Sequence, residues 1–510
     1  MSDGSILAQT ARGAGWVMAW RMMTRLLGLA STLVLVRLLS PADFGLVALA
    51  TAFALALDVC LSIGVEDQIV RSHDPRPALY DTAFTLNLIR CLVVAVLIGL
   101  AAAPAAQFFN DPRLRDVLGA LAFSAALSGA ANVGVADFRR RLAFDKEFKL
   151  QFLPRLAGIT VTLAVAWLLR SHWALVLGIL TNRLGVVVMG HVLHPYKPRL
   201  SLAAWRELIG VSLWSWAISL VAVARDRADS LVIGRVLGPA PLGIYAVGVE
   251  VAVLPATELV DPICRACMPG FAATLRGGGD AQLAEAFLRI IAMMALLTLP
   301  AGIGISLVAG PVVALAFGQG WLEAAPVIAI LGAACTVLLL GNVSSALLNA
   351  RAALRTILGV TVASAVVRIG LLLPLTAWLG VFGAACALGL SLVIEHLTLL
   401  GCALRLLRLP ALRLLMAVQR PVVATMIMAG LLWSFGLGWG APPADARAAA
   451  TLLLTAIPLG AISYLAALLV LWLAAGRPAG AEQDMFRQLS QMARHALVFL
   501  SRLPLAARGG

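Results

Sequence analysis

Charged side chains are scarce in this sequence. Asp, Glu, Lys and Arg make up 13% of its 510 residues, whereas a soluble domain carries about 25%. The chain also lacks any large polar region from which a soluble domain could be built. Long apolar runs recur from one end to the other instead, as membrane-spanning segments do. This pattern excludes a soluble globular protein and predicts an all-α polytopic membrane protein.

Lysine is almost absent, occurring only at Lys146, Lys149 and Lys197, so that Arg carries nearly all of the net charge of +14. The Arg preference is explained either by codon bias or by the proton that Arg keeps at membrane depth. A basic balance often indicates nucleic-acid binding, but these basic residues lie in loops between apolar runs. They report membrane topology, and we expect no nucleic-acid partner.

Motifs for metal or nucleotide chemistry are also missing. Cys264-x-x-Cys267 has the spacing of metal ligands, but it has no second pair and no nearby His, so no metal site is expected. The chain holds no Asp-x-Asp motif and no Gly-x-x-x-x-Gly-Lys phosphate loop. We therefore expect no enzyme activity, no ATP hydrolysis and no cofactor.

About fourteen spans are predicted, each near the ~20 residues that a bilayer requires. Arg and Lys gather in every second loop, which by the positive-inside rule places both termini in the cytoplasm. The outward loops are short, so no folded external domain is expected. The approximate limits of the spans are 16–36, 44–64, 82–103, 116–137, 152–170, 172–193, 208–236, 242–268, 284–309, 322–348, 354–377, 380–404, 419–439 and 449–474.

Two parts of the chain resemble each other. The segment from Val34 to Gly45 matches that from Val232 to Gly243 in its Arg, Pro-Ala and Gly residues, and Asn132-Val133 matches Asn342-Val343 in the same order. Six spans separate the copies, which predicts two six-helix lobes related by an axis along the membrane normal. Such lobes usually enclose a central cavity and work by alternating access.

The predicted organisation has four parts. The lobes cover 1–205 and 206–410, two additional spans cover 411–475, and a cytoplasmic amphipathic tail covers 476–510. In the tail, apolar residues from Leu489 to Leu503 recur at helical spacing with Arg interspersed. The tail is read either as an interfacial helix or as a helix packed on the cytoplasmic face of the protein.

Four segments carry a resemblance to a known family. They are Arg37-Leu-Leu-Ser-Pro-Ala-Asp-Phe-Gly45, His194-Pro-Tyr-Lys-Pro-Arg-Leu-Ser-Leu202, Asp229-Ser-Leu-Val-Ile-Gly-Arg-Val-Leu-Gly238 with Leu242-Gly-Ile-Tyr245 after it, and Pro262-Ile-Cys-Arg265 with Pro269. In order and spacing they resemble the Wzx-type polysaccharide flippases of the multidrug/oligosaccharidyl-lipid/polysaccharide superfamily.

The resemblance implies a flippase of twelve to fourteen helices with a cavity between two lobes. It implies transfer of an undecaprenyl-pyrophosphate-linked oligosaccharide from the cytoplasmic to the periplasmic leaflet of a bacterial inner membrane. The product would enter O-antigen, capsule or exopolysaccharide synthesis, with a polymerase or export complex as a further partner. The family motifs are mostly structural turns and designate no substrate-reading residue.

Arginines within the spans are the candidates for substrate binding. Ionisable groups at this depth are costly and often functional, and guanidinium groups in a wet cavity could replace the hydration of a pyrophosphate. Snorkelling from a span end is the alternative for Arg21 and Arg155. The candidates are Arg21, Arg25, Arg90, Arg155, Arg183 and Arg368.

Carboxylates within the spans form a second candidate group. Arg225 and Asp229 lie one helical turn apart and are expected to pair, while Glu250 and Asp261 share a helix face. These groups are candidates either for ion coupling or for a buried ion network that neutralises neighbouring Arg residues. The set comprises Asp58, Arg225, Asp226, Asp229, Glu250, Glu258 and Asp261.

Four other functions are alternatives to the flippase. A drug or metabolite antiporter of the same superfamily should favour acidic and aromatic groups, whereas these spans hold more Arg than carboxylate. A flippase for a peptidoglycan lipid precursor needs a cationic lining too and is poorly separated by sequence. A membrane glycosyltransferase or polymerase needs carboxylates on the outer face, and a passive scaffold has no need for buried charge.

Overall fold

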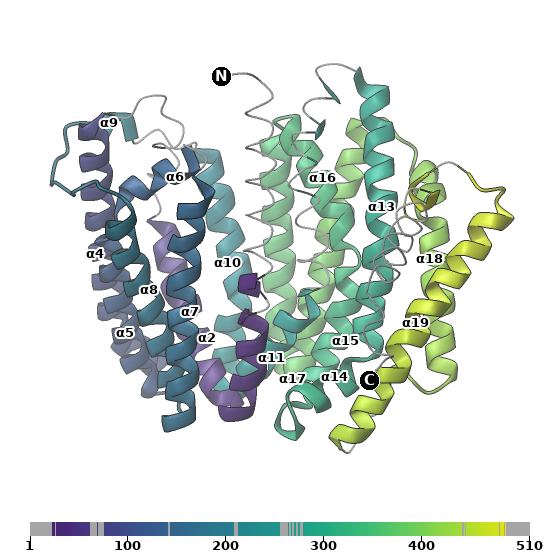
Figure 1. The fold of residues 1–510 in the computed structure, drawn as a ribbon, viewed down its shortest axis with the longest axis horizontal. Helices are drawn as coiled ribbons and strands as arrows, with labels where there is room; N and C mark the ends of the chain where they lie inside the picture. Colours follow the sequence, from purple (N-terminus) through teal and green to yellow (C-terminus); the bar gives the residue numbers. More distant parts are fainter. Residues whose placement is uncertain are drawn as a thin grey trace, which may run out of the picture. The chain divides into compact units, whose positions relative to one another are not determined.

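The computed structural model describes residues 23–25, 27–61, 69, 76–140, 143–208, 213–254, 264, 267, 270–271, 274–275, 279–440, 443, 445–478, 480–483 and 485. Within these ranges the chain is helical, with no strand among the described residues (Figure 1). Large apolar side chains lie on the outside: Trp378 is 83% exposed and Leu454 75% exposed. An apolar exterior fits lipid surroundings, where exposed apolar groups carry no penalty.

The chain forms two compact units. The first comprises Met1–Val247, Ala316–Ala324 and Thr361–Ala387, and the second comprises Gly248–Leu315, Ala325–Val360 and Leu388–Gly510.

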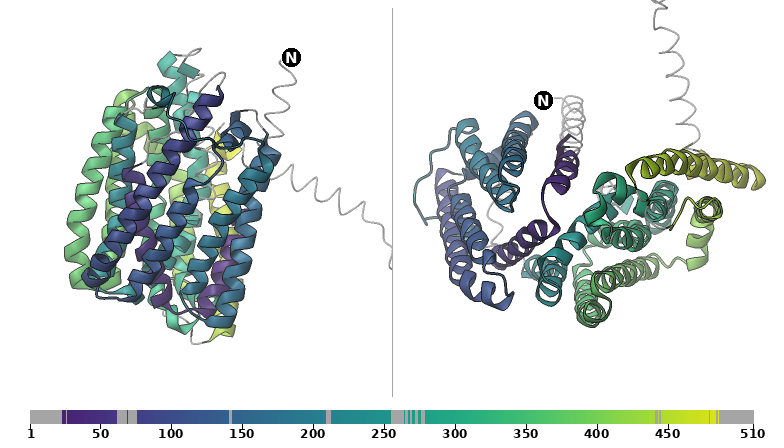
Figure 2. Two further views of the ribbon diagram at one scale, coloured as in Figure 1. Left: turned by 90° about the vertical axis from the view of Figure 1, so that its left-hand side faces the viewer. Right: turned by 90° about the horizontal axis from the view of Figure 1, so that it is seen from below.

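In the first unit, a helix covers residues 27–38. The elements that follow are α2 (Pro41–Cys60), α4 (Pro77–Phe108), α5 (Arg113–Gly129), η1 (Val133–Val135), α6 (Ala136–Arg140), α7 (Phe144–Leu169), α8 (Trp173–Leu193), α9 (Trp205–Leu208), α10 (Leu213–Val236) and the start of α11 (Pro239–Ala252). Neighbours in sequence pack as antiparallel hairpins, α4 on α5 and α7 on α8, as the views in Figure 2 show.

The second unit contains most of the later helices. Its elements are α13 (Gly279–Leu307), α14 (Ala309–Ala316), α15 (Ala324–Cys335), α16 (Leu338–Ala350), α18 (Ala411–Ser434) and α19 (Ala446–Ala474), with the two ends of α17 (Leu354–Leu406); η2 (Gln319–Trp321) belongs to the first unit. Its core is formed by buried side chains of α13, α16 and the end of α17, such as Phe287, Leu347 and Ala403.

Fewer spans are established than the fourteen predicted. Eight helices are long and apolar enough to cross a membrane, or ten if each of two bent pairs counts as one span, among the described residues. Part of the difference lies in α17, whose 53 residues would extend about 80 Å, far beyond a hydrocarbon core of ~30 Å. Gly380 breaks this helix with φ 62° and ψ −139°, and a Cβ at Gly383 would collide with the Leu375 carbonyl oxygen, so the chain reverses here.

Both bent pairs carry the second duplicated motif. The first pair, Arg113–Gly129 with Val133–Arg140, bends by 68°, and the second, Ala324–Cys335 with Leu338–Ala350, bends by 45°. Asn132 lies at the first bend, where its side chain accepts a hydrogen bond from the Gly134 amide. Asn342 lies in the second helix of the second pair. Both duplicated Asn residues thus belong to bent helix pairs, Asn132 at the bend itself and Asn342 in the helix that follows the bend.

The segment with the His-Pro-Tyr-Lys-Pro motif is fastened to the start of α4. The Tyr196 hydroxyl donates to Asp81 at 2.7 Å, and the Asn132 amide donates to the Tyr196 carbonyl oxygen at 3.0 Å. Burial, together with the hydrogen bond to Asp81, raises the pKa of Tyr196. This motif is thus a structural connection, as the family resemblance implied.

Candidate functional site

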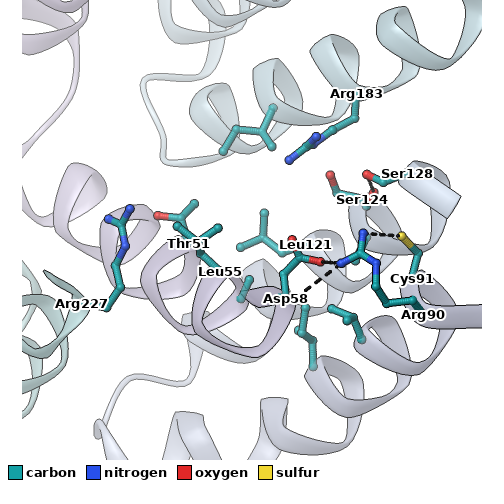
Figure 3. Close-up of a pocket in the computed structure, with 15 residues that line it drawn as sticks. Thr51, Leu55, Asp58, Arg90, Cys91, Leu121, Ser124, Ser128, Arg183 and Arg227 are labelled. Atoms are coloured by element: carbon teal, nitrogen blue, oxygen red, sulfur yellow. Dashed lines mark hydrogen bonds and ion pairs between the residues drawn. The ribbon is translucent and has the colours of Figure 1, made fainter. Parts of the chain in front are cut away.

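A cavity of about 340 Å³ lies among the helices of the first unit (Figure 3). Its lining comes from α2, α4, α5, α8 and α10, so that residues distant in sequence face one space. Apolar side chains such as Leu55, Val94 and Leu121 form part of the wall. The polar and charged residues of the wall are Thr51, Asp58, Arg90, Cys91, Ser124, Ser128, Arg183 and Arg227.

Arg90 of α4 is held by an ion pair with Asp58 of α2. Its Nη1 lies 2.6 Å from Asp58 Oδ1, and the Arg90 side chain is only 19% exposed. The Asn87 amide oxygen and the Cys91 sulfur each accept from Nη2, at 3.2 and 3.4 Å. The sequence placed Arg90 among the substrate candidates and Asp58, as an isolated residue, among the ion candidates; the structure joins them.

Arg183 of α8 enters the same cavity. Figure 3 shows its guanidinium directed into the space that Ser124 and Arg90 also face. Within the part of the chain that the structure describes, Arg183 forms no ion pair. Three Arg and one Asp line the cavity, so its formal charge is 3 − 1 = +2. Positive charge in a space of low dielectric attracts an anion more strongly than it would in water.

Arg227 of α10 is a cavity residue that the sequence missed. Its Nε is buried and has no hydrogen-bond partner among the described residues. The available signal was helical spacing, because Arg227 is two positions from both Arg225 and Asp229 and therefore lies about 200° around the helix from each. When Arg225 and Asp229 face one neighbour, Arg227 must face the opposite side.

Arg368 does not line this cavity; it lies in a buried ion network. Its Nε donates to Asp229 Oδ1 at 3.0 Å, and its Nη2 pairs with Asp229 Oδ2, a bidentate arrangement. Arg368 is 6% and Asp229 3% exposed. The Tyr245 hydroxyl also donates to Asp229 Oδ2, at 2.7 Å. The Asp229 carboxylate therefore receives three hydrogen bonds out of contact with solvent.

The network continues to Asp226, and its pairing differs from expectation. The sequence predicted an Arg225–Asp229 pair, but Asp229 is bound by Arg368, and Arg225 Nε donates to Asp226 Oδ1 at 2.9 Å. Arg368 Nη1 also reaches Asp226 Oδ1, at 3.3 Å. The pairing was missed because Arg368 lies on a helix 139 residues away from Asp229. Two Arg and two Asp balance here, which supports the structural reading of these carboxylates.

Of the remaining candidates, Arg25, Arg155 and Glu250 lie within the described residues, and the others lie outside them. A Cβ at Gly28 would lie 3.2 Å from the Arg155 guanidinium, so Arg155 of α7 reaches the first helix one turn from Arg25, which is half-buried. Glu250 is exposed on α11. Arg21, Glu258 and Asp261 lie outside the described residues, as does nearly all of the predicted tail helix.

The duplicated turns contact each other directly. A Cβ at Gly45 would collide with the Pro239 carbonyl oxygen, and a Cβ at Gly243 would collide with the Pro41 carbonyl oxygen. Each glycine thus packs on the proline of the other copy, at equivalent positions of the repeat. A reciprocal contact of this kind is what a two-fold relation between the copies produces.

A third segment covers the first copy of the turn. The Trp321 indole donates to the Val36 carbonyl oxygen at 3.1 Å, and Arg37 Nε donates to the Ala316 carbonyl oxygen at 3.0 Å. The Trp321 ring also meets Phe44 edge-on, with centroids 5.4 Å apart. The start of α2 therefore contacts both the start of α11 and the 316–324 segment.

Comparisons with known proteins place these features in a family. The family described as polysaccharide biosynthesis protein matches residues 34–326. The lipopolysaccharide biosynthesis protein WzxC of Escherichia coli (strain K12) is 26% identical over 68% of this chain and 71% of its own length. The succinoglycan biosynthesis transport protein ExoT of Rhizobium meliloti (strain 1021) is 23% identical over 98% of this chain and 97% of its own.

Solved structures share the fold. The lipid II flippase MurJ, in an inward closed conformation, superposes with a TM-score of 0.71 at 12% identity, covering 90% of this chain and 99% of that one. An inward-facing multidrug resistance MATE family transporter of the MOP superfamily gives a TM-score of 0.59 at 15% identity, covering 76% and 94%. At these identities the likeness concerns the fold alone.

Proposed function

This chain belongs to the polysaccharide biosynthesis protein family, and from that membership we propose that it is a flippase for a lipid-linked oligosaccharide. Its substrate in this proposal is an oligosaccharide on undecaprenyl pyrophosphate, moved from the cytoplasmic to the periplasmic leaflet of the bacterial inner membrane. The chain is a multi-pass membrane protein of the kind that the resemblance implied.

The cationic cavity of the first unit carries the proposal. A pyrophosphate must cross an apolar layer with its negative charge, and guanidinium groups can replace its hydration through charge-assisted hydrogen bonds. Arg183 is open to such a ligand because no carboxylate pairs with it within the described part of the chain. The hydroxyls of Ser124 and Ser128 line the same space and are of the type that donates to phosphate or sugar oxygens.

Asp58 has a distinct role in this proposal. Its carboxylate holds Arg90 in place, and a pyrophosphate would compete for the same guanidinium. Substrate binding would then release the Asp58 carboxylate inside the membrane, where an unpaired charge is unfavourable. A proton or a cation taken up by Asp58 would relieve that cost and couple transport to an ion gradient.

The locked turns supply the closed end of an alternating-access cycle. By the positive-inside rule, the Gly45 and Gly243 turns lie on the periplasmic side. Contact between them, with the Trp321 segment over the first turn, would close the periplasmic exit in this conformation. Release of substrate would require these turns to separate.

The wider organisation remains part of the proposal. We retain two six-helix lobes, 1–205 and 206–410, two additional spans in 411–475 and a cytoplasmic tail in 476–510, with both termini in the cytoplasm. The lobes are supported by the reciprocal contact of the duplicated turns. A polysaccharide polymerase or export complex is the further partner proposed.

Removal of the gene from its host tests the assignment. Undecaprenyl-linked intermediates are extracted and identified by mass spectrometry, and surface polysaccharide is assayed. We expect an unpolymerised undecaprenyl-pyrophosphate glycan to accumulate, and wild type to clear it. Arg183→Gln should clear it about 10- to 100-fold more slowly, the factor expected when a hydrogen bond to a charged group is lost.

The matched control is Arg115→Gln, which removes the same charge from an exposed position at the start of α5. It should rescue as wild type does. Accumulation of a peptidoglycan lipid precursor instead would assign the chain to that rival flippase activity. Normal intermediates together with altered tolerance to drugs would favour an antiporter, although a cavity of charge +2 is unsuited to cationic drugs.

A further inference from the structure

We propose that the second unit holds a binding site for the phosphate headgroup of an anionic membrane phospholipid. The site lies between α13, α18 and the segment after α19, and it shares no residue with the cavity of the first unit. A cavity of about 610 Å³ there is lined by Arg289, Arg413 and Arg420, with Glu285 and Glu482. A cavity of about 320 Å³ also contains Glu285, Leu288 and Arg413 and adds Arg408.

The ion pairs leave positive charge in this double cavity. Arg420 Nη1 binds Glu482 Oε1 at 2.7 Å, and the Glu482 side chain is only 7% exposed, so this pair is internal to the protein. Asp280, in the wall of the smaller cavity, forms an ion pair with Arg351. Apart from Arg289, the charges that remain are Arg408 and Arg413 against Glu285, a formal 2 − 1 = +1.

Arg408 and Arg413 are the groups open to a ligand. Both are exposed, and neither forms an ion pair within the part of the chain that the structure describes. They approach one space from different elements, since Arg408 follows the end of α17 and Arg413 lies in the first turn of α18. A phosphate between them would accept hydrogen bonds from two guanidinium groups.

The surroundings of Arg413 favour a lipid over a soluble phosphate. Leu412 and Leu415 are each 59% exposed, and Met416 is 53% exposed, which identifies this face of α18 as lipid-facing. Met416 also lines the larger cavity, so the cationic space borders the apolar exterior. A phospholipid can place its phosphate on the arginines and its chain along these side chains. The positive-inside rule places Arg408 and Arg413 on the cytoplasmic side. Basic pockets between spans on that side of a membrane bind anionic headgroups.

Lipid binding by the purified full-length protein, measured by native mass spectrometry, tests the site. The probes are phosphatidylglycerol, which is anionic, and phosphatidylethanolamine, which is zwitterionic. We expect Arg408→Gln/Arg413→Gln to weaken binding of the first phosphatidylglycerol about 30-fold, at roughly five- to sixfold per basic residue. Binding of phosphatidylethanolamine should not change. The single variant Arg413→Lys, which keeps the charge, should retain most of the wild-type affinity for phosphatidylglycerol.

The charge-matched control is Arg405→Gln/Arg447→Gln, because both arginines are exposed and line neither cavity. Equal losses in the two double variants, or no loss in the first, would overturn the site. Displacement of the lipid by inorganic phosphate alone would make it a soluble-anion site. Tighter and equally Arg-dependent binding of farnesyl pyrophosphate would place it on the path of a polyprenyl substrate. Either result would refute the phospholipid assignment.

Discussion

At the scale of single residues, the arginines within the spans divide by their partners. Arg368 pairs with the buried Asp229 and the exposed Asp226, Arg90 pairs with one aspartate in a cavity wall, and Arg183 has no carboxylate partner among the described residues. The three residues look alike in sequence, since each is an Arg within an apolar run. In the proposed flippase, their different surroundings would give them three different tasks: Arg368 would fix helices, Arg90 would exchange its partner, and Arg183 would bind the ligand.

The Arg368 network leads to a prediction about stability. Arg368→Met should lower the free energy of unfolding by about 3–5 kcal/mol, because Asp229 is left buried without its counter-charge. Arg368→Met/Asp229→Asn should recover a large part of that loss, since a neutral amide is less costly to bury than a carboxylate. Thermal unfolding of the purified protein in detergent measures both. If the double variant is no more stable than the single one, the pair is not the source of the effect.

Sequence patterns identified the charged residues but not their contacts. Arg90, Arg183 and Asp58 were selected because charge in a span is rare, and all three line one cavity. Their proximity could not be derived, because they lie on α4, α8 and α2 and helical spacing relates only residues on the same helix. The Arg225–Asp229 pairing failed for the same reason, as the partner of Asp229 came from a distant helix.

At the scale of elements, the duplicated turn was the most informative sequence signal. Ser40 caps α2 together with Asp43, as a capping box with Pro41 at the first turn, which explains why the Ser-Pro-x-Asp pattern begins a helix. The shared glycines had no explanation within one copy of the turn. In the structure each glycine faces the proline carbonyl of the other copy. The glycines are therefore explained by the contact between the two copies of the turn.

A methyl group at Gly45 should therefore disrupt this contact. Gly45→Ala places a Cβ against the Pro239 backbone, which cannot move aside as a flexible side chain can, and overpacking of this kind typically costs about 1–3 kcal/mol. We expect a lower melting temperature and faster exchange of the amides near Gly243 in hydrogen–deuterium exchange. Gly99→Ala on α4, where a Cβ meets open space, serves as the control. Equal behaviour of the two variants would show that the turns do not depend on close approach.

At the scale of the whole molecule, composition predicted the class correctly, whereas eight to ten of the fourteen predicted spans are established among the described residues. Helix α10 is not among the established spans, because the charged cluster from Arg225 to Asp229 makes its sequence polar. Arg225, Asp226 and Asp229 are paired with Arg368 and with one another, and Arg227 faces the cavity, so α10 can cross a membrane although its sequence is polar. Hydropathy alone counts such a helix as unfavourable, since it records the charges and not their pairing.

Fourteen spans with both termini in the cytoplasm remain a prediction. A fluorescent protein fused after residue 510 should fluoresce, and alkaline phosphatase fused after residue 440 should be active, because the positive-inside rule places these points on opposite sides. Phosphatase fused after residue 355 should be inactive. An active enzyme at 355, or a dark fluorescent fusion, would require an odd number of spans or the opposite orientation.

The pairing of Arg368 with Asp229 also has a mechanical consequence. Two parallel hydrogen bonds between a guanidinium and a carboxylate resist both sliding and rotation of the helices that carry them. A displacement of residues 361–379 is thus transmitted to α10, from which Arg227 reaches the cavity. The segment 361–379 and α10 would therefore move as one rigid unit. Rotation of that segment would displace Arg227 and so change the shape of the cavity around Asp58 and Arg183, although the segment contacts neither residue.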